Sequence, residues 1–383
     1  MKHAVDNVID NVTDKPLVRV VVQVVQHLRA GGIECLVLEM MRSSLRSNDE
    51  DMHIISLEGC MEEALLKWPR LLPYKKKLHF INKKPGLSFT CLFKTKKLLT
   101  DLKADVLHSH HIGPLIYGGI AAKLNNINCR IHTEHDAWHM ADHKRRYLES
   151  MFLKWVKPIL VADATGVQKQ LTSYQPNYPS QVIHNGIDCQ MFHKGNQPYA
   201  RAQLGLVQNR EGESVKYIGC AGRLTEVKGH KYLIDALKFL KENCILVLAG
   251  EGEYRDELEM YIQQSGLTDR VILLGNIDNM VNFYQAIDVF CLPSLNEGLP
   301  LSPLEAQACG IPVVLTDVGG CREACCPDSG VMVPAKDGTA LAWAIRQILK
   351  KLSRDQVPSP RQFVTKERDF INMLDEYRLL YQQ

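Results

Sequence analysis

The chain has 383 residues, of which 45% are apolar and 23% charged, and its formal net charge is +3. This is the composition of an ordinary soluble globular protein, and it excludes a disordered chain, a collagen-like fibre and a disulfide-stapled miniature fold. The near balance of charge also argues against a strongly polyanionic partner such as nucleic acid. The length predicts two domains.

The amino-terminal segment, residues 1–14, contains no apolar core of the kind found in signal peptides, so we expect no cleaved leader. The longest apolar segment, residues 17–25, is interrupted by Arg19 and Gln23 and is well short of the roughly 20 residues that span a membrane. The twelve cysteines include no CxxC pair and no zinc-like spacing with histidine. We therefore expect reduced thiols, no metal and a cytoplasmic protein.

Short runs rich in β-branched residues alternate with helical patterns along the whole chain. In the first half, the predicted strands are residues 17–25, 52–57, 78–81, 105–109, 129–133 and 159–162. In the second half, they are residues 182–184, 216–221, 245–249, 271–274, 289–292 and 312–315. Apolar strands separated by helices are typical of parallel sheets that are covered on both faces. The pattern therefore predicts an α/β protein with two Rossmann-like domains.

The junction between these domains is predicted near residues 186–200, where glycine, asparagine and proline give loop chemistry. This places an amino-terminal domain over residues 1–190 and a carboxy-terminal domain over residues 191–360. Residues 361–383 repeat apolar side chains with helical spacing, which predicts a final helix.

In open parallel sheets, ligands bind at the carboxyl ends of the strands, so polar motifs that follow strands are candidate site residues. The first such motif is Gly31-Gly32, which follows the first strand and opens a helix. Paired glycines let a backbone approach a phosphate, and the start of a helix favours negative charge. The alternative interpretation is a tight turn between strand and helix.

The second motif places two cations, Arg223 and Lys228, in one short loop after the strand at residues 216–221. A planar guanidinium and a compact ammonium together suit a diphosphate. The alternative is a solvated basic loop.

The third motif carries the strongest signal. A predicted helix over residues 301–309 is preceded by a loop that contains Gly298 and Pro300. Glu297 lies before the helix and Glu305 inside it, about 12 Å apart if the whole spacing were helical. Two carboxylates that flank an anion-binding helix start match the order of groups in a sugar nucleotide: sugar hydroxyls, diphosphate, ribose hydroxyls. The alternative is a helix with a favourable acid near its start.

The fourth motif is a crowd of ionisable residues, His132-Thr-Glu134-His135, at the end of the strand near residues 129–133. A histidine such as His135 at this edge could hold a substrate hydroxyl or a developing charge, although a single histidine is more often structural. The preceding strand ends in His110-His111, which could face the same site.

Taken together, these motifs resemble the retaining glycosyltransferases of family 4, of the bacterial polysaccharide type, which have the GT-B fold. The specific part is the E-x7-E element, Glu297 to Glu305, with Arg223 and Lys228 upstream. The string at residues 182–188, at the predicted junction, is also characteristic. The resemblance covers nearly the whole chain.

The resemblance implies two Rossmann-like domains with parallel sheets that face a central cleft, and a carboxy-terminal helix that crosses back to the first domain. It also implies transfer of a sugar, with retention of configuration, from a UDP- or GDP-linked donor to an acceptor hydroxyl. The acceptor would be a saccharide or a lipid-linked saccharide. Neither a metal nor a separate cofactor is expected, because protein cations would stabilise the leaving diphosphate.

The resemblance also implies roles for single residues. It assigns the diphosphate to Arg223 and Lys228, the ribose hydroxyls to Glu305 and the hydroxyls of the transferred sugar to Glu297. Further implied contacts are the base at Ile277, backbone contacts at Gly298, Leu299, Pro300 and Leu301, an approach to the donor by Gly31 and Gly32, and a position near the anomeric centre for His135.

Two other functions are compatible with the same fold. A catalytically inactive partner subunit would not need the four charged residues, all of which are present. A sugar-nucleotide epimerase would need acid and base carboxylates at the anomeric centre, and the E-x7-E context fits a transferase better.

One basic stretch accounts for the positive charge of the first half. Residues 67–103 contain eleven lysines and arginines and a single acid, Asp101. Apolar residues, among them Trp68, Leu71, Phe89 and Phe93, are interleaved with the lysines, as in segments that lie at an anionic membrane surface. Two interpretations stay open: a peripheral contact with the cytoplasmic membrane, and a solvated basic face.

Overall fold

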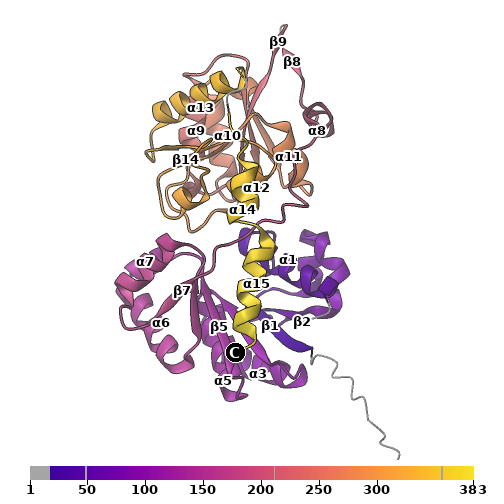
Figure 1. Cartoon of the computed structure of the whole chain (residues 1–383), viewed down its shortest axis with the longest axis vertical. Coiled ribbons are helices and arrows are strands. Elements are labelled where there is room, and N and C mark those ends of the chain that lie inside the picture. Colours follow the sequence, from indigo (N-terminus) through magenta and orange to yellow (C-terminus); the bar gives the residue numbers. More distant parts are fainter. Residues whose placement is uncertain (1–17, 48–49, 211, 355–356) are drawn as a thin grey trace, which may run out of the picture. The chain divides into compact units, whose positions relative to one another are not determined.

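The computed structural model describes residues 18–47, 50–210, 212–354 and 357–383, and it contains two parallel β-sheets with helices packed on them (Figure 1). The segment for which we expect no cleaved leader, residues 1–14, lies outside the described residues. No helix within the described ranges is long and apolar enough to cross a lipid bilayer.

The larger sheet has seven strands in the order β3-β2-β1-β4-β5-β6-β7. These are β1 (Arg19–Val25), β2 (Glu50–Ser56), β3 (Leu78–Phe80), β4 (Val106–His110), β5 (Cys129–Glu134), β6 (Ile159–Ala162) and β7 (Ser180–Val182). The pairing is parallel; β1 runs in register with β2 from Arg19 opposite Glu50 to Val25 opposite Ser56.

The smaller sheet has six strands in the order β12-β11-β10-β13-β14-β15, again with parallel pairing. These are β10 (Lys216–Ala221), β11 (Cys244–Ala249), β12 (Val271–Gly275), β13 (Val289–Leu292), β14 (Val313–Thr316) and β15 (Val331–Val333). A short antiparallel ribbon, β8 (Asn209–Arg210) with β9 (Glu213–Ser214), precedes it.

Helices connect the strands. Those of the first part of the chain are α1 (Gly32–Ser47), α2 (Met61–Lys67), η1 (Pro69–Lys77), α3 (Phe89–Asp101), α4 (Ile112–Pro114), η2 (Leu115–Gly119), α5 (Ile120–Leu124), η3 (Trp138–Ala141), α6 (His143–Val156) and α7 (Thr165–Tyr174). The later ones are α8 (Gln197–Gln203), η4 (Glu226–Lys228), α9 (His230–Leu237), α10 (Arg255–Gln264), η5 (Thr268–Arg270), α11 (Met280–Ala286), α12 (Leu301–Ala308), η6 (Cys321–Ala324), α13 (Gly338–Leu352), α14 (Arg361–Glu367) and α15 (Phe370–Tyr381).

The strand predictions are confirmed for both sheets, with small differences at the ends. The largest shift is at β7, which occupies Ser180–Val182 and so begins before the predicted residues 182–184. The prediction missed β15 (Val331–Val333). The central strands β11, β13 and β14 are buried at every position, which explains their continuous apolar sequences.

Contacts among the described residues divide the chain into two compact units. The first comprises the described parts of Met1–Ser109 and Gly113–Arg130, and the second comprises His110–Ile112 and Ile131–Gln383. The second unit therefore holds β5 to β7, the six-stranded sheet and the end of the chain. The predicted domain boundary at residue 190 stays a prediction.

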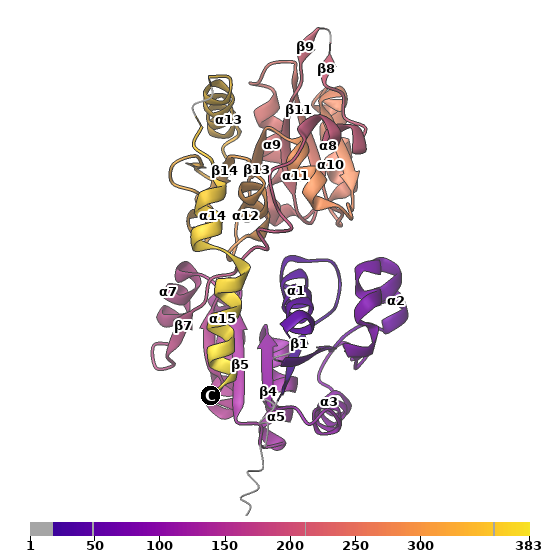
Figure 2. The ribbon, with the colours of Figure 1, turned by 45° about the vertical axis from the view of Figure 1, so that its right-hand side comes forward.

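The last segment of the chain is helical, as predicted, but it forms two helices rather than one. The break falls at Asp369, which forms a β-bridge with Ile187 and whose side chain accepts a hydrogen bond from the Ile371 N–H at the start of α15. Helix α15 then runs beside β5 (Figure 2), where the hydroxyls of Tyr377 and Thr133 lie 3.0 Å apart. The last helix thus packs on the seven-stranded sheet, as expected.

All twelve cysteines lie within the described residues, and none of them forms a disulfide. Ten of them are buried; Cys35 and Cys60 are half-buried. Burial raises the pKa of the Cys220 and Cys309 thiols to about 12. These side chains therefore act as small apolar groups of the core.

Candidate functional site

Three loops at one edge of the six-stranded sheet are joined through their backbones. After β10, the Gly222 N–H donates to the Ala249 carbonyl (3.0 Å), and after β11, the Gly250 N–H donates to the Gly275 carbonyl (2.8 Å). The loop that carries Arg223 and the loop that carries Ile277 thus flank the same central loop. The side chain of Arg223 is exposed and that of Ile277 is half-buried. Two of the predicted donor-binding segments therefore share one edge of the sheet.

The fourth loop, which follows β13, is held against the same edge by Gly229. This residue has a φ of 64°, and a Cβ atom there would lie 2.2 Å from the Pro293 carbonyl oxygen, so only glycine fits. The close approach brings Lys228 to the loop after β13. The Lys228 Nζ atom donates to Glu297 Oε1 at 2.6 Å, and the Ser294 hydroxyl donates to the same oxygen at 2.6 Å.

The pair of Lys228 and Glu297 is largely shielded from solvent, since the exposed fractions of the two side chains are 22% and 9%. Two residues that were predicted from separate motifs are thus in direct contact. The sequence did not predict this ion pair, because it had assigned each side chain to a different part of the donor.

Helix α12 follows this loop and begins close to its predicted start, with Pro300 as the preceding residue. Pro300 supplies no side-chain cap to the first amides of the helix, and amides at a helix start are suited to an anion. Glu305 lies within the helix, and its Oε2 atom accepts a hydrogen bond from the Tyr284 hydroxyl. Burial raises the pKa of Tyr284, which keeps this hydroxyl a donor. The two carboxylates therefore flank the start of α12, as the sequence indicated.

The loop after β13 also touches the end of β5. A Cβ atom on Gly298 would lie 1.7 Å from the His135 carbonyl oxygen, so a side chain at this position would clash with the backbone. On its other side, the Gly298 carbonyl accepts a hydrogen bond from the Gly320 N–H at 3.0 Å. The structure thus brings His135 next to the loop that carries Glu297.

The His135 side chain is buried and held from both ring nitrogens. Its Nδ1 atom lies 3.2 Å from Asp163 Oδ2, and its Nε2 atom lies 3.0 Å from His110 Nδ1. Asn185 donates to the same Asp163 oxygen at 2.9 Å, and the Leu299 N–H also donates to this carboxylate. Burial raises the pKa of Asp163 well above its usual value. The network fixes the ring of His135 relative to the loop after β13.

Sequence reasoning missed Asp163 and Asn185. A signal was present for the first, because Asp163 directly follows β6, as His135 follows β5. Asn185 falls in the characteristic string at residues 182–188, but nothing in that string indicates a contact with an aspartate. Of the predicted pair His110-His111, His110 is the residue that contacts His135 through its ring nitrogen.

Two residues of the fourth motif, His132 and Glu134, form a second cluster with Glu149, a partner that the sequence did not indicate. One ligand atom from each of His132, Glu134 and Glu149 lies within 4.8 Å of the other two, and all three side chains are buried. Glu149 belongs to α6 and is distant in sequence, and no cysteine is involved, so a search for zinc-like spacing could not find the set.

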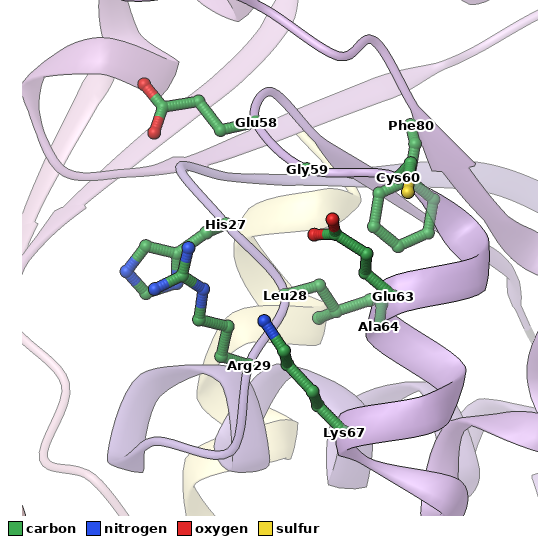
Figure 3. Close-up of a pocket in the computed structure, with 10 residues that line it drawn as sticks. All are labelled: His27, Leu28, Arg29, Glu58, Gly59, Cys60, Glu63, Ala64, Lys67 and Phe80. Atoms are coloured by element: carbon green, nitrogen blue, oxygen red, sulfur yellow. The ribbon is translucent and has the colours of Figure 1, made fainter. Parts of the chain in front are cut away.

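In the first unit, Gly31 and Gly32 stand at the start of α1, where the sequence placed them. Nearby, the loops that follow β1 and β2 line a small pocket of about 30 Å³. Figure 3 shows that Arg29 and Lys67 project into this pocket from different elements, together with His27. The pocket has both charged and apolar lining residues and lies at the carboxyl ends of strands, where ligands bind in such sheets.

The basic stretch of the first unit is only partly arranged as the membrane interpretation requires. Trp68 and Leu71 are buried and belong to the core, which corrects their assignment to an interfacial surface. By contrast, the exposed fractions of Leu87 and Phe89 are 90% and 79%, and Phe93, one helical turn further along α3, is also exposed. Several lysines between residues 75 and 97 are exposed as well.

Comparison with known families identifies both parts of the chain. Residues 17–191 match the family described as Glycosyltransferase Family 4, and residues 206–367 match the family described as Glycosyl transferases group 1. Two glycosyltransferase family models thus match the chain, one in each part. The matched ranges include every residue that the sequence resemblance singled out in the donor and histidine motifs.

Several curated relatives are glycosyltransferases. A UDP-Gal:alpha-D-GlcNAc-diphosphoundecaprenol alpha-1,3-galactosyltransferase of Escherichia coli is 32% identical over 58% of this chain and 60% of its own length. A lipopolysaccharide core biosynthesis mannosyltransferase of Rhizobium meliloti is 31% identical over 48% of this chain and 54% of its own length. The chain therefore spans between half and two thirds of the length of these relatives.

Solved structures share the fold. A glycosyltransferase from Rickettsia africae has a TM-score of 0.78 at 21% identity and covers 95% of this chain and 98% of its own. The Anabaena protein Alr3699/HepE, solved in complex with UDP and glucose, has a TM-score of 0.81 at 18% identity and covers 95% of this chain and 99% of its own. The predicted fold, two Rossmann-like domains of the GT-B type, is confirmed.

Proposed function

We propose that this protein is a retaining glycosyltransferase that moves a sugar from a UDP- or GDP-linked donor to a hydroxyl of a saccharide or lipid-linked saccharide, in polysaccharide or glycolipid synthesis. The observation that carries the proposal is the contact between Lys228 and Glu297 just before α12, with Glu305 further along the same helix.

The arrangement of charges suits the hard step, which is cleavage of the bond between the anomeric carbon and the phosphate. The transition state resembles an oxocarbenium ion, as in glycoside hydrolysis, and negative charge grows on the departing diphosphate. Lys228, Arg223 and the first amides of α12 are fixed positive groups for this charge, and such preorganised groups are usually the largest catalytic contribution. No metal is needed in this scheme.

The two carboxylates would orient the donor. Both hydrogen bonds that Glu297 accepts from Lys228 and Ser294 use Oε1, which leaves Oε2 in position to accept a hydroxyl of the transferred sugar. Glu305, held by Tyr284, would accept from the ribose hydroxyls. Ile277 would contact the base. Its loop and the loop that carries Arg223 both adjoin the loop after β11, so the two residues lie at the same edge of the sheet.

His135 would lie near the anomeric carbon in this proposal. Its contact with Asp163 holds the ring in one orientation, and the close packing of Gly298 on its carbonyl keeps it at the end of the donor loop. No carboxylate in this network is placed as a convincing covalent nucleophile, so the acceptor hydroxyl would attack from the face that the phosphate leaves.

The acceptor is proposed from chemistry and from relatives. The Escherichia coli relative is named for a diphosphoundecaprenol-linked acceptor, and the Rhizobium meliloti relative for lipopolysaccharide core biosynthesis. The exposed apolar residues Leu87, Phe89 and Phe93, next to exposed lysines, support a peripheral contact with an anionic leaflet on which such an acceptor is presented.

The test is a panel of UDP-, GDP- and ADP-linked sugars, with thermal shift as the binding readout and nucleotide release as the turnover readout. We expect one nucleotide class to raise the unfolding temperature and to be slowly hydrolysed without acceptor. A protein that binds no nucleotide sugar would be an inactive partner subunit. A protein that returns an epimerised donor without releasing nucleotide would be an epimerase.

A further inference from the structure

The two faces of β5 carry different chemistry. Because side chains alternate along a strand, His132 and Glu134 of β5 share one face, and Thr133 lies on the other. The Thr133 hydroxyl lies 3.0 Å from the hydroxyl of Tyr377 on α15. On the opposite face, His132 Nε2 lies 2.7 Å from Glu134 Oε1, and both side chains are fully buried. The strand thus presents a histidine and a glutamate to the interior.

Helix α6 adds a third group to this face. Glu149 is also fully buried, and one ligand atom from each of the three residues lies within 4.8 Å of the other two. Zinc binds histidine nitrogen and carboxylate oxygen at about 2.0–2.2 Å. A small inward rotation of these side chains would therefore place all three ligand atoms around a single ion.

Two carboxylate oxygens in this cluster lack a hydrogen bond. Among the described residues, neither Glu134 Oε2 nor Glu149 Oε1 has a hydrogen-bond partner, although both atoms are buried. Such atoms are costly to bury unless a proton, a water molecule or a cation satisfies them.

A second histidine orients the helix residue of the cluster. His139 Nε2 lies 2.8 Å from Glu149 Oε2, and its Nδ1 atom lies 3.1 Å from Asp136 Oδ1.

We propose that His132, Glu134 and Glu149 bind one divalent cation, with His139 as the outer partner that orients Glu149. One imidazole and two carboxylates suit zinc among the divalent ions, and outer partners of this kind are usual in metal sites. The ion would join β5 to α6 directly behind His135. This site is separate from the proposed donor site, and its existence does not depend on the proposed function.

The direct test is the metal content of the full-length chain, purified from cells grown with added zinc and desalted into chelator-treated buffer. We expect one equivalent of zinc in the wild type. Glu149→Gln should contain less zinc, by on the order of tenfold or more, because it loses a ligand. Glu257→Gln is the matched control, because Glu257 is an exposed glutamate on α10, and it should keep the full equivalent.

Thermal unfolding provides a second readout that needs no activity. Because an ion bound only to the folded chain stabilises it, prolonged chelation should lower the unfolding temperature of the wild type and of Glu257→Gln. Glu149→Gln should not respond. The proposal would be overturned if the wild-type protein contained no zinc and its unfolding temperature did not change when zinc was added. This outcome can be read even if Glu149→Gln fails to fold. The carboxyls would then be satisfied by protons or water.

Discussion

Lys228 and Glu297 form the most direct link between motifs that are about seventy residues apart in the sequence. An exposed ion pair contributes little to stability, but this pair is mostly shielded and Glu297 also accepts from Ser294. Before a donor binds, each of the two side chains neutralises the charge of the other. If a donor phosphate competes for Lys228, as we propose, Lys228 would contact that phosphate and Glu297 would keep its hydrogen bond from Ser294, so neither group would lose all its partners.

Lys228→Ala should lower kcat by roughly 10²–10³-fold, because it removes one fixed group that stabilises the charge of the leaving diphosphate. The measurement is steady-state nucleotide release with the donor found in the panel, and circular dichroism checks that the fold survives.

The control for this variant is Lys241→Ala. Lys241 is an exposed lysine that precedes β11, at the opposite edge of the same sheet. It should turn over at the wild-type rate. Near-normal kcat in Lys228→Ala would remove Lys228 from the mechanism.

At the scale of elements, helix α7 begins with a cap supplied by another element. Its own preceding residue is Ala164, which has no side chain that could cap the helix. Glu323 of η6 caps the helix instead. Its carboxylate accepts hydrogen bonds from the Thr165 N–H at 2.8 Å and from the Gly166 N–H at 2.6 Å. His184 lies 3.1 Å from the same carboxylate. The start of α7 thus depends on a residue more than 150 positions later in the chain.

Glu323→Gln should lower the stability of the protein at neutral pH by about 0.5–2 kcal/mol, the usual range for loss of a helix cap. Burial opposes ionisation of Glu323, but the hydrogen bonds from His184, Gly166 and Thr165 lower its pKa to about 2 from a usual 4.5. The folded chain therefore binds fewer protons here than the unfolded chain, and this stabilising contribution is present above pH 4.5 and lost as the pH falls toward 2.

Urea unfolding at a series of pH values measures this effect. The difference in unfolding free energy between wild type and Glu323→Gln should shrink as the pH falls from about 4.5, the usual pKa of a glutamate. The exposed Glu376→Gln on α15 serves as control and should follow the wild type. A difference that is constant over this range would show that the charge of Glu323 does not contribute.

The strands and the two sheets could be predicted because apolar runs and helical spacing are local patterns. The donor motifs could be placed at a common edge, since each follows a strand. By contrast, the contacts of His135 with Asp163 and of Glu134 with Glu149 join distant segments, and no spacing reveals them. The sequence also could not show whether an apolar side chain of this stretch points to the core or to solvent. Trp68 and Leu71 were predicted to be interfacial, but both are buried.

At the scale of the whole molecule, charge is distributed unevenly along the chain. The net charge of +3 hides a stretch, residues 67–103, with eleven basic residues and one acid. In the structure, this stretch contributes exposed apolar groups at Leu87, Phe89 and Phe93 in addition to its lysines. Such a mixture suits an anionic lipid surface, because the lysines attract the headgroups and the rings enter the interface.

The purified protein should sediment with vesicles that contain anionic lipid at low salt, and binding should weaken as salt screens the charges. The double variant Lys75→Glu/Lys76→Glu should reduce binding, since each basic residue near the surface contributes about 1 kcal/mol. Lys350→Glu/Lys351→Glu, at the exposed end of α13, serves as the charge-matched control. Equal binding by the two double variants, or none by the wild type, would contradict the membrane interpretation.

The distribution of cysteines has a practical consequence for experiments on this protein. Ten thiols are buried, and only Cys35 and Cys60 are partly accessible. Both lie in the first unit, Cys35 in the first turns of α1 and Cys60 in the wall of the pocket (Figure 3). An alkylating reagent or a fluorescent maleimide would thus modify the native chain at these two positions. The wild-type sequence therefore already contains reporter positions beside Gly31-Gly32 and the pocket, and no cysteine needs to be introduced.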